Sequence, residues 1–239
     1  MAGLRSSGQP KLMRARSEAD KQLVREAFVA AGRKLFSRGD PASVSLRAIA
    51  AEAGYSPAAI YSYFSDQHDL FTRIRELEIE RAVTVLHREI EGVTEPRERL
   101  LTLLTATAEH WVERMDDFLL IFPRHSASMP TEPPDANAVA FAETPVMRRM
   151  LTLYEGAVVD YFATLPKAPM DPLMATDMLI AAVHGTLMIP CMARTKKWNC
   201  SRTMVRHLVT AVVECWDGQL NEAVSSKPAG RARSRSPAR

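Results

Sequence analysis

The stretch GYSPAAIYSYFSD, residues 54–66, combines a Ser-Pro pair with three aromatic side chains within four positions. Pro57 suits the first position of a helix, and Ser56 suits the capping position before it. With Ile60 placed inward, a helical step of about 100° per residue points Phe64 inward as well. The stretch therefore predicts a short helix that buries one narrow apolar face.

The outer face of this helix has an unusual composition. Ala58 and Ser62 point almost directly away from the buried side, and Tyr61 and Tyr63 lie on its flanks. Small side chains let a helix approach base edges in the major groove, while phenol hydroxyls can donate hydrogen bonds to phosphates on either side. Alternatively, the two tyrosines cover the core of a small helical domain. The combination with the small tip favours contact with duplex DNA.

The preceding residues predict the rest of a helix-turn-helix. Ser45 is placed to cap a short helix that Gly54 ends, and a tight turn then leads into the helix described above. Before it, apolar residues spaced three and four apart predict a helix over residues 17–38, ended by Gly39. A further helix is expected over residues 66–91.

Charge is distributed unevenly along the 239 residues. Residues 1–75 carry 12 Lys and Arg against 7 Asp and Glu, whereas residues 76–224 carry 14 against 21. Residues 225–239 carry five basic residues and no acidic ones. A basic first third beside an acidic middle indicates that one part of the protein meets a polyanion. The two ends, residues 1–16 and 225–239, are expected to be disordered basic arms.

Several classes of protein are not indicated. The start has no apolar stretch typical of a secretory signal, and no apolar run of about 18 residues predicts a membrane span. The three cysteines suit a reduced, cytoplasmic protein, and a zinc site formed by them with His184 or His207 lacks the usual spacing. We expect no metal and no cofactor. No catalytic motif is present, so we expect no enzymatic activity. The cysteines are Cys191, Cys200 and Cys215.

Residues 44–71, VSLRAIAAEAGYSPAAIYSYFSDQHDLF, closely resemble the DNA-binding signature of tetracycline-repressor-like (TetR/AcrR) transcriptional regulators. The resemblance covers about residues 20–71. It implies an all-α fold, with a three-helix DNA-binding domain over residues 17–66 and a larger helical domain for ligand binding and dimerisation over residues 67–224. Relatives often open the next helix with a phosphate-binding Lys, where this chain has a neutral glutamine. The positions that the resemblance assigns to DNA contact are Ser45, Arg47, Ser56, Pro57, Ala58, Ala59, Tyr61, Ser62, Tyr63 and Gln67.

Beyond residue 71 the resemblance is one of layout. Helices are expected to start at Pro96, Pro145 and Pro172, followed by a last helix over residues 201–224. The helix after Pro172 is apolar on nearly all sides and must be covered all round. In this family the last two long helices pair with their copies in a second subunit; alternatively, the helix is central to a monomer. The last helix carries an expected apolar stripe of Met204, Leu208, Ala211, Val212 and Cys215.

The acidic, helical middle is expected to enclose a pocket for a small effector. Methionine and aromatic side chains suit an apolar or aromatic ligand, although they suit an ordinary core equally well. His184 is a candidate to orient a polar group of the ligand. The candidate ligand-binding residues are Trp111, Met115, Phe118, Phe122, Met147, Met150, Tyr154, Met178 and His184.

Together these features predict a cytoplasmic, homodimeric transcriptional regulator that binds double-stranded DNA in a sequence-specific manner. The main hypothesis is a repressor that a small apolar or aromatic effector releases from a near-palindromic operator. The alternatives are an architectural DNA-binding protein, or an activator without a ligand-release mechanism.

Overall fold

The structure is a computed structural model, and the expected all-α class is confirmed. Every regular element within the described residues is a helix, and no strand occurs there. The described residues are 17–38, 43–122, 141–192 and 196–225. The two terminal arms expected from the sequence lie mainly outside these ranges.

The chain forms two compact units. Unit 1 contains residues up to 81 together with 115–148, and unit 2 contains residues 82–114 together with those from 149 onward. The helix-turn-helix region therefore packs with a later segment of the chain, and packing does not divide the protein at residue 66. The functional boundaries at residues 66 and 224 stay a prediction.

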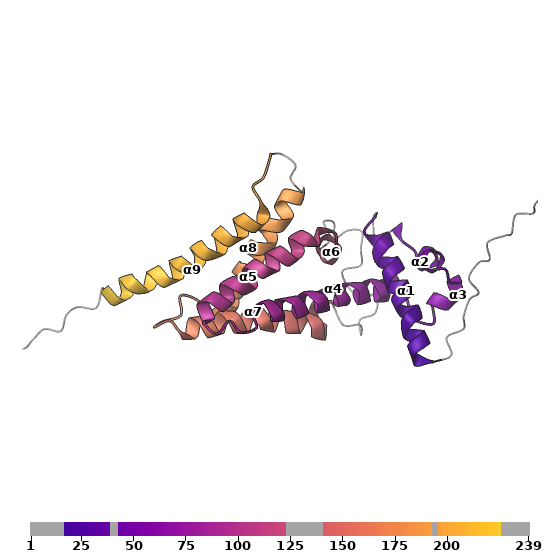
Figure 1. Cartoon of the computed structure of the whole chain (residues 1–239), viewed down its shortest axis with the longest axis horizontal. Coiled ribbons are helices and arrows are strands. Elements are labelled where there is room, and N and C mark those ends of the chain that lie inside the picture. Colours follow the sequence, from indigo (N-terminus) through magenta and orange to yellow (C-terminus); the bar gives the residue numbers. More distant parts are fainter. Residues whose placement is uncertain (1–16, 39–42, 123–140, 193–195, 226–239) are drawn as a thin grey trace, which may run out of the picture. The chain divides into compact units, whose positions relative to one another are not determined.

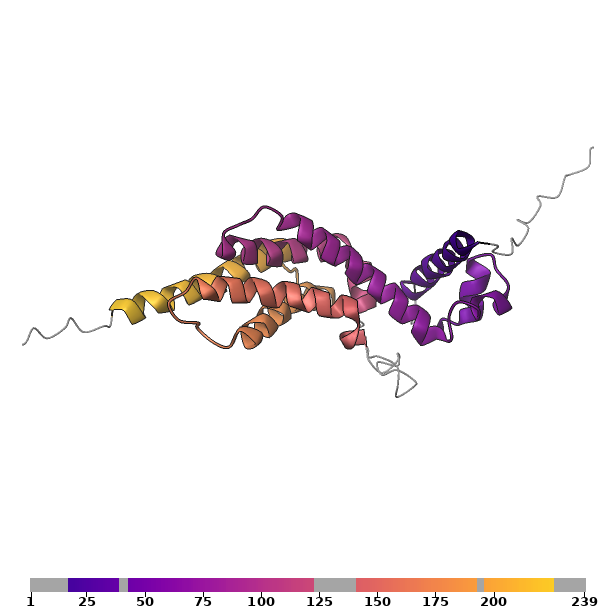
Figure 2. The same cartoon turned by 90° about the horizontal axis from the view of Figure 1, so that it is seen from below.

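Unit 1 is built around the helix-turn-helix, with α1 lying against α2 and α2 against α3 (Figure 1). The long helix α4 begins in this unit and continues into unit 2, as Figure 2 shows. The elements of unit 1 are α1 (Glu18–Phe36), α2 (Leu46–Glu52), α3 (Pro57–Ile60), the first part of α4 (Gln67–Glu89), α6 (Met115–Ile121) and the 3₁₀ turn η2 (Phe141–Glu143).

Helix α1 begins with a capping box. The hydroxyl of Ser17 accepts a hydrogen bond from the Asp20 N–H, and the Asp20 carboxylate accepts one from the Ser17 N–H, each at 3.1 Å. The helix ends at Phe36, with Ser37 as its C-cap, slightly earlier than the expected end. Gly39, which was expected to end this helix, lies outside the described residues.

The core of unit 1 is formed by side chains from α1 to α4. Phe28, Ile49 and Ile60 are completely buried, and Phe64 is almost so. Helices α1 and α4 approach closely at Gly32, where an added Cβ would lie 3.0 Å from the Ile74 side chain. The buried apolar face predicted for the helix-turn-helix is therefore the face that forms this core.

A buried ion cluster links three helices of unit 1. Arg33 of α1 donates two hydrogen bonds from Nη2 to the Asp117 carboxylate of α6, at 2.6 and 2.7 Å. Glu78 of α4 lies 3.4 Å from Arg33 Nε and 2.6 Å from Arg81 Nη1. Both carboxylates are almost fully buried, so each depends on its guanidinium partners for charge compensation. The cluster ties α6 to the helix-turn-helix bundle.

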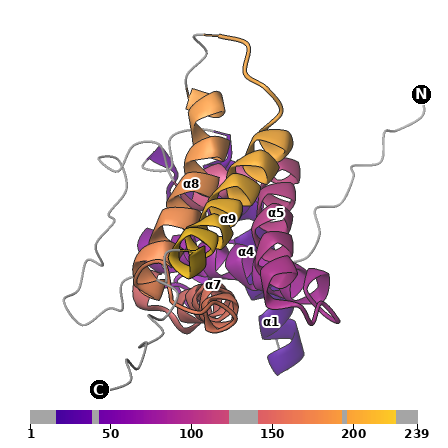
Figure 3. The ribbon, with the colours of Figure 1, turned by 90° about the vertical axis from the view of Figure 1, so that its left-hand side faces the viewer.

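Unit 2 is a second helical bundle. Helices α8 and α9 lie side by side and both contact α5 (Figure 3). As expected, proline occupies the first helical position of α5, α7 and α8, and the Glu95 carboxylate caps α5 by accepting from two backbone N–H groups. The helices are α5 (Pro96–Glu113), α7 (Pro145–Ala163, mostly in this unit), α8 (Pro172–Met192) and α9 (Ser201–Ser225).

The inward face of α9 differs from the expected one. The buried residues are Val205, Val209, Val213 and Trp216, spaced by three and four. The expected stripe of Met204, Leu208, Ala211, Val212 and Cys215 is instead partly or fully exposed. The helix carries two adjacent apolar stripes, and packing against α5 and α8 selects the valine-rich one, whose compact side chains allow close approach.

Helix α8 buries only one side. Ala175, Leu179, Val183 and Leu187 face the core of unit 2, at a regular spacing of four. Five large apolar side chains remain about half exposed: Leu173, Met174, Met178, Ile189 and Met192. By length and composition α8 is also able to span a membrane, so the expectation that no segment reaches this limit is wrong; one such helix is weak evidence for a membrane.

Candidate nucleic-acid interface

The turn between α2 and α3 has a fixed geometry. Gly54 has a φ of +77°, a left-handed conformation that residues with a Cβ rarely adopt. The Tyr55 N–H donates to the Ala50 carbonyl at 2.8 Å, and the Gly54 N–H donates to the Ala51 carbonyl at 3.1 Å. This pair of hydrogen bonds is a Schellman motif, which ends α2 and orients α3.

Helix α3 is shorter than expected. Its α-helical part has four residues, and the chain then tightens into turns in which the Tyr63 N–H donates to the Ile60 carbonyl at 2.9 Å. The capping hydrogen bond expected from the Ser56 side chain is absent. The reason is that the Ala59 N–H, the usual partner of such a cap, donates to the Ser56 backbone carbonyl at 3.0 Å.

The outer face of α3 and the following turn is accessible. Ala58 and Ser62 are both exposed, which contact with a duplex requires. The ring of Tyr61 is also exposed, at 55%. Tyr63 is different, because its ring is partly buried and lies 5.6 Å from the Phe28 ring. The alternative role of covering the core therefore applies to Tyr63, and Tyr61 keeps the phosphate role as a prediction.

The other predicted contact positions lie around this tip. The exposed Ser45 caps α2 by accepting from the Ala48 N–H at 3.2 Å, and Arg47 is exposed in the first turn of α2. Pro57 is exposed and Ala59 is partly buried against the core. Gln67 is partly buried at the first position of α4. Contact of these residues with DNA stays a prediction.

The predicted ligand-binding residues are divided between the two units. Unit 1 contains Met115, Phe118, Phe122 and Met147, and unit 2 contains the remaining five. Met178 points outward and is 48% exposed, whereas Tyr154 is buried. The residues that the structure buries are Trp111, Phe118, Met150 and Tyr154, and those it buries in part are Met115, Phe122, Met147 and His184.

Tyr154 is the predicted ligand residue that lines an internal gap in unit 2. The gap has no room for a water-sized molecule, and it is lined by Leu100, Leu104, Tyr154, Val158, Thr176, Leu179 and Ile180. The Tyr154 hydroxyl is 2.7 Å from the Thr107 hydroxyl, and burial raises the pKa of Tyr154 to about 12. Ligand pockets for drug-sized molecules usually hold about 300–1,000 Å³. The gap around Tyr154 is therefore closed in this structure and is not a ligand pocket as it stands.

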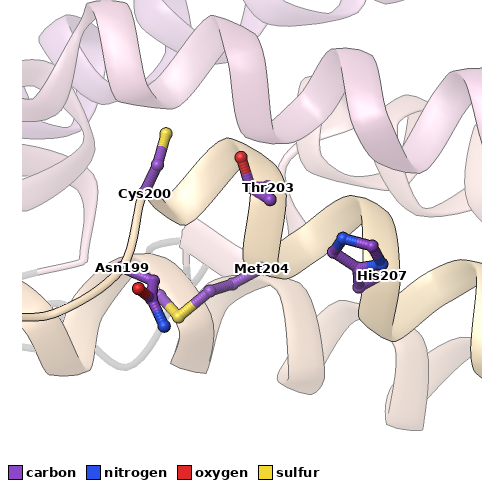
Figure 4. A pocket seen from close by; sticks show the side chains of 5 residues that line it. All are labelled: Asn199, Cys200, Thr203, Met204 and His207. Atoms are coloured by element: carbon purple, nitrogen blue, oxygen red, sulfur yellow. The ribbon is translucent and has the colours of Figure 1, made fainter.

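A shallow surface groove lies at the start of α9, between Cys200 and His207 (Figure 4). Its side chains do not converge on one point, since Cys200 and Met204 point in different directions in Figure 4. Within the described part of the chain, no group of three or more His, Cys, Asp and Glu residues is arranged to hold a metal ion. The groove is lined by Asn199, Cys200, Thr203, Met204 and His207.

His184 makes the stability of the protein depend on pH. Burial in α8 lowers the pKa of His184 to about 4, below the ordinary value of 6.5. Between pH 6.5 and pH 4 the unfolded chain therefore binds a proton that the folded protein does not, so stability falls as the pH falls. At about 1.36 kcal/mol per pKa unit a fully buried group would lose about 3.4 kcal/mol across this window; because His184 is only partly buried, we expect a loss of about 2 kcal/mol.

Urea denaturation at several pH values measures this effect. The His184→Gln variant is expected to show a shallower fall in unfolding free energy between pH 6.5 and pH 4. His207→Gln is the matched control, because His207 is exposed on α9 and its loss should leave the slope unchanged. Equal slopes in wild type and His184→Gln would contradict the assignment.

Sequence reasoning did not identify three charged side chains of unit 1: the buried Glu78 and Asp117, and the partly buried Arg75. A signal was nevertheless present. Arg75 lies four residues after Phe71 and four before Ile79, so helical periodicity places it on an apolar face. Asp117 stands in the same relation to Ile121. A charged residue on an apolar helix face has to be paired or to bind something.

A capped helix, a glycine turn and a short helix with a small, exposed tip define a helix-turn-helix DNA-binding protein. Residues 28–74 match the family model described as bacterial regulatory proteins, tetR family. The resemblance noted in residues 44–71 is thereby confirmed, and it applies to this N-terminal segment of the chain.

A curated relative agrees with the match to this family model. An uncharacterized HTH-type transcriptional regulator of Mycobacterium tuberculosis (strain H37Rv) is 36% identical over 86 residues, which cover 36% of this chain and 43% of that protein. The match thus spans less than half of the curated relative.

Solved structures show the same fold over most of the chain. A protein of unknown function from Rhodococcus sp. RHA1 has a TM-score of 0.63 at 20% identity and covers 89% of this chain and 99% of its own. The transcriptional regulator FadR from Bacillus subtilis, in complex with stearoyl-CoA, has a TM-score of 0.61 at 14% identity and covers 80% and 96%.

Proposed function

We propose that this protein is a cytoplasmic, homodimeric repressor that binds a near-palindromic operator and is released from it by a small apolar or aromatic effector. The observation that carries the proposal is the exposed tip of Ala58 and Ser62 on a segment whose opposite face, Ile60 and Phe64, is buried. This arrangement leaves the backbone of α3 free to approach base edges, with the Tyr61 hydroxyl beside it for phosphate.

The uncovered faces of α8 and α9 support the homodimer. Leu173, Met174 and Met178 begin a series of exposed apolar side chains on α8, and the outer stripe of α9 adds Leu208 and Val212. Apolar surface of this kind marks interaction sites in soluble proteins. A two-fold axis between two copies would present two α3 helices to half-sites about 34–36 Å apart on the DNA.

Release by an effector is supported by one of the structural relatives. The structural relative FadR was solved with stearoyl-CoA, so this fold accommodates a small molecule in at least one protein. For this chain the effector is a proposal, and its identity is a matter for screening.

The test is a footprint of the purified protein on the DNA upstream of its own gene. We expect one discrete, dyad-symmetric protected site, occupied by a species with about twice the chain mass of 26.6 kDa in light scattering. Apolar and aromatic metabolites are then screened for release. Uniform protection of any DNA, with a steep salt dependence and no effect of any compound, would instead favour an architectural protein.

Tyr61→Phe tests the phosphate role of the exposed tyrosine. Loss of one hydrogen bond to a charged group is expected to weaken binding about tenfold, and by a similar factor for every DNA sequence, because phosphate contacts carry no base information. Fluorescence anisotropy with operator and unrelated duplexes measures both affinities. A change in base preference with unchanged nonspecific affinity would show that the hydroxyl contacts a base.

A further inference from the structure

Arg75 of α4 is a partly buried cation, and no described residue is an acidic partner for it. Its Nη2 donates to the Ile121 carbonyl at the end of α6, at 2.8 Å. No carboxylate within the described ranges pairs with it, and its Nε is buried without a hydrogen-bond partner there. This differs from Arg33 and Arg81 in the same unit, which both bind buried carboxylates.

The surroundings of Arg75 are otherwise aromatic. The guanidinium carbon lies 3.6 Å from the centre of the Phe141 ring and 5.5 Å from that of Phe71. Ring faces attract a cation, but they replace only part of the hydration that burial removes. Burial accordingly lowers the pKa of Arg75 to about 10, and the group still carries its charge at neutral pH. Among the described residues, one carbonyl and two ring faces therefore compensate this charge, without a carboxylate.

We propose that Arg75 binds the anionic group of the effector, a carboxylate or a phosphate monoester attached to an apolar body. A guanidinium offers a planar pair of donors that fits both groups, and Nε belongs to that pair. Arg75 is partly buried as a residue, but its Nε is a buried atom, so an anion that binds this fork has to displace the side chains that cover it. The proposal deepens the proposed function, because it specifies the chemistry of the releasing molecule.

The neighbouring side chains suit the apolar body of such a ligand. The rings of Phe118 and Phe122 in the α6 segment are tilted against each other with centres 5.1 Å apart, and in sequence they flank Ile121, whose carbonyl accepts from Arg75. Phe141 covers the guanidinium itself. Anion binding would place a ligand against α4 and α6, and α6 is tied to α1 through Asp117 and Arg33. Occupation of this site is therefore communicated directly to the DNA-binding bundle.

The test measures binding of three probes to the full-length protein by isothermal titration calorimetry. Decanoate and decyl phosphate carry the two candidate anionic groups, and decanol is the neutral counterpart of similar length. We expect at least one anion to bind at least about tenfold more tightly than decanol, as charge-assisted hydrogen bonds require. The tighter anion identifies the natural class. Equal affinity for all three probes would overturn the proposal.

Variants assign the anion to Arg75. Arg75→Gln keeps a donor for the Ile121 carbonyl but removes the charge, and is expected to lower anion affinity at least about tenfold while leaving decanol unchanged. Arg88→Gln is the matched control, since Arg88 is an exposed arginine of the same helix. Unchanged anion affinity in Arg75→Gln contradicts the assignment. If that variant does not fold, Arg75→Lys, which keeps the charge but loses the planar fork, should show an intermediate loss.

DNA binding is measured separately by anisotropy, so the two proposals can fail independently. Anion binding through Arg75 without any specific DNA binding would contradict the proposed repressor function and support the anion site. Operator release by neutral compounds alone would retain the repressor and reject the anion site.

Discussion

Ala58→Glu is expected to abolish specific DNA binding without unfolding the protein. Ala58 is exposed near the start of α3, on the face proposed to enter the major groove. A glutamate there brings bulk and a negative charge toward base edges and phosphates, and like charges at an interface cost several kcal/mol. A loss of about 100-fold or more in operator affinity follows, since about 1.4 kcal/mol corresponds to a factor of ten.

The fold should tolerate this substitution. A negative charge in the first turn of a helix is favourable or neutral, and the side chain has no buried neighbour to displace. Circular dichroism and thermal unfolding check this point, and anisotropy measures the affinity. Ala30→Glu is the matched control, because Ala30 is an exposed alanine of α1 and receives the same change in charge. Operator affinity of Ala58→Glu within a factor of three of wild type would remove α3 from the interface.

Phe28→Ala is expected to have the largest effect on stability. The Phe28 ring is completely buried, with the rings of Tyr55 and Tyr63 centred 5.1 and 5.6 Å away. Truncating a buried phenylalanine to alanine usually costs about 3–5 kcal/mol, because the cavity closes only in part. Much of the stability of a typical domain is lost at that cost.

The loss should be local to unit 1. Hydrogen exchange measured by mass spectrometry is expected to accelerate in peptides of α1 to α3, and operator binding should weaken because Tyr63 loses the ring that orients it. Phe28→Leu retains most of the volume and should cost less than about 1.5 kcal/mol. Protection in α1 to α3 that survives Phe28→Ala would show that Phe28 does not organise this core.

Helix starts were the most predictable part of the fold. Ser17, Ser45 and the prolines at positions 57, 96, 145 and 172 all lie where the structure begins a helix. These signals act within three or four residues, so a single sequence contains them completely. Ser56 shows the limit of such signals. Its position before the helix was predicted correctly, but its capping hydrogen bond was not, because in the short α3 the Ala59 N–H donates to the Ser56 backbone carbonyl instead.

The exposed tip of the helix-turn-helix was also predictable from the sequence. A short helix with a single apolar face buries that face, so the opposite face is exposed. The sequence could not predict which stripe of α9 faces inward, because the helix has two apolar stripes and the neighbouring helices determine which one is buried. The charged side chains of unit 1 show the same limit. The sequence could place Arg75 on an apolar helix face, but it could not predict which described side chains would surround it.

From its own residues, the sequence of this protein determined the all-α class, the helix-turn-helix and the small-residue tip, because each depends on neighbours along the chain. The tertiary structure alone decided the pairing of Arg33 with Asp117, the aromatic surroundings of Arg75 and the outward stripe of α9. Those features join residues far apart in sequence, and their energies depend on which side chains burial brings together.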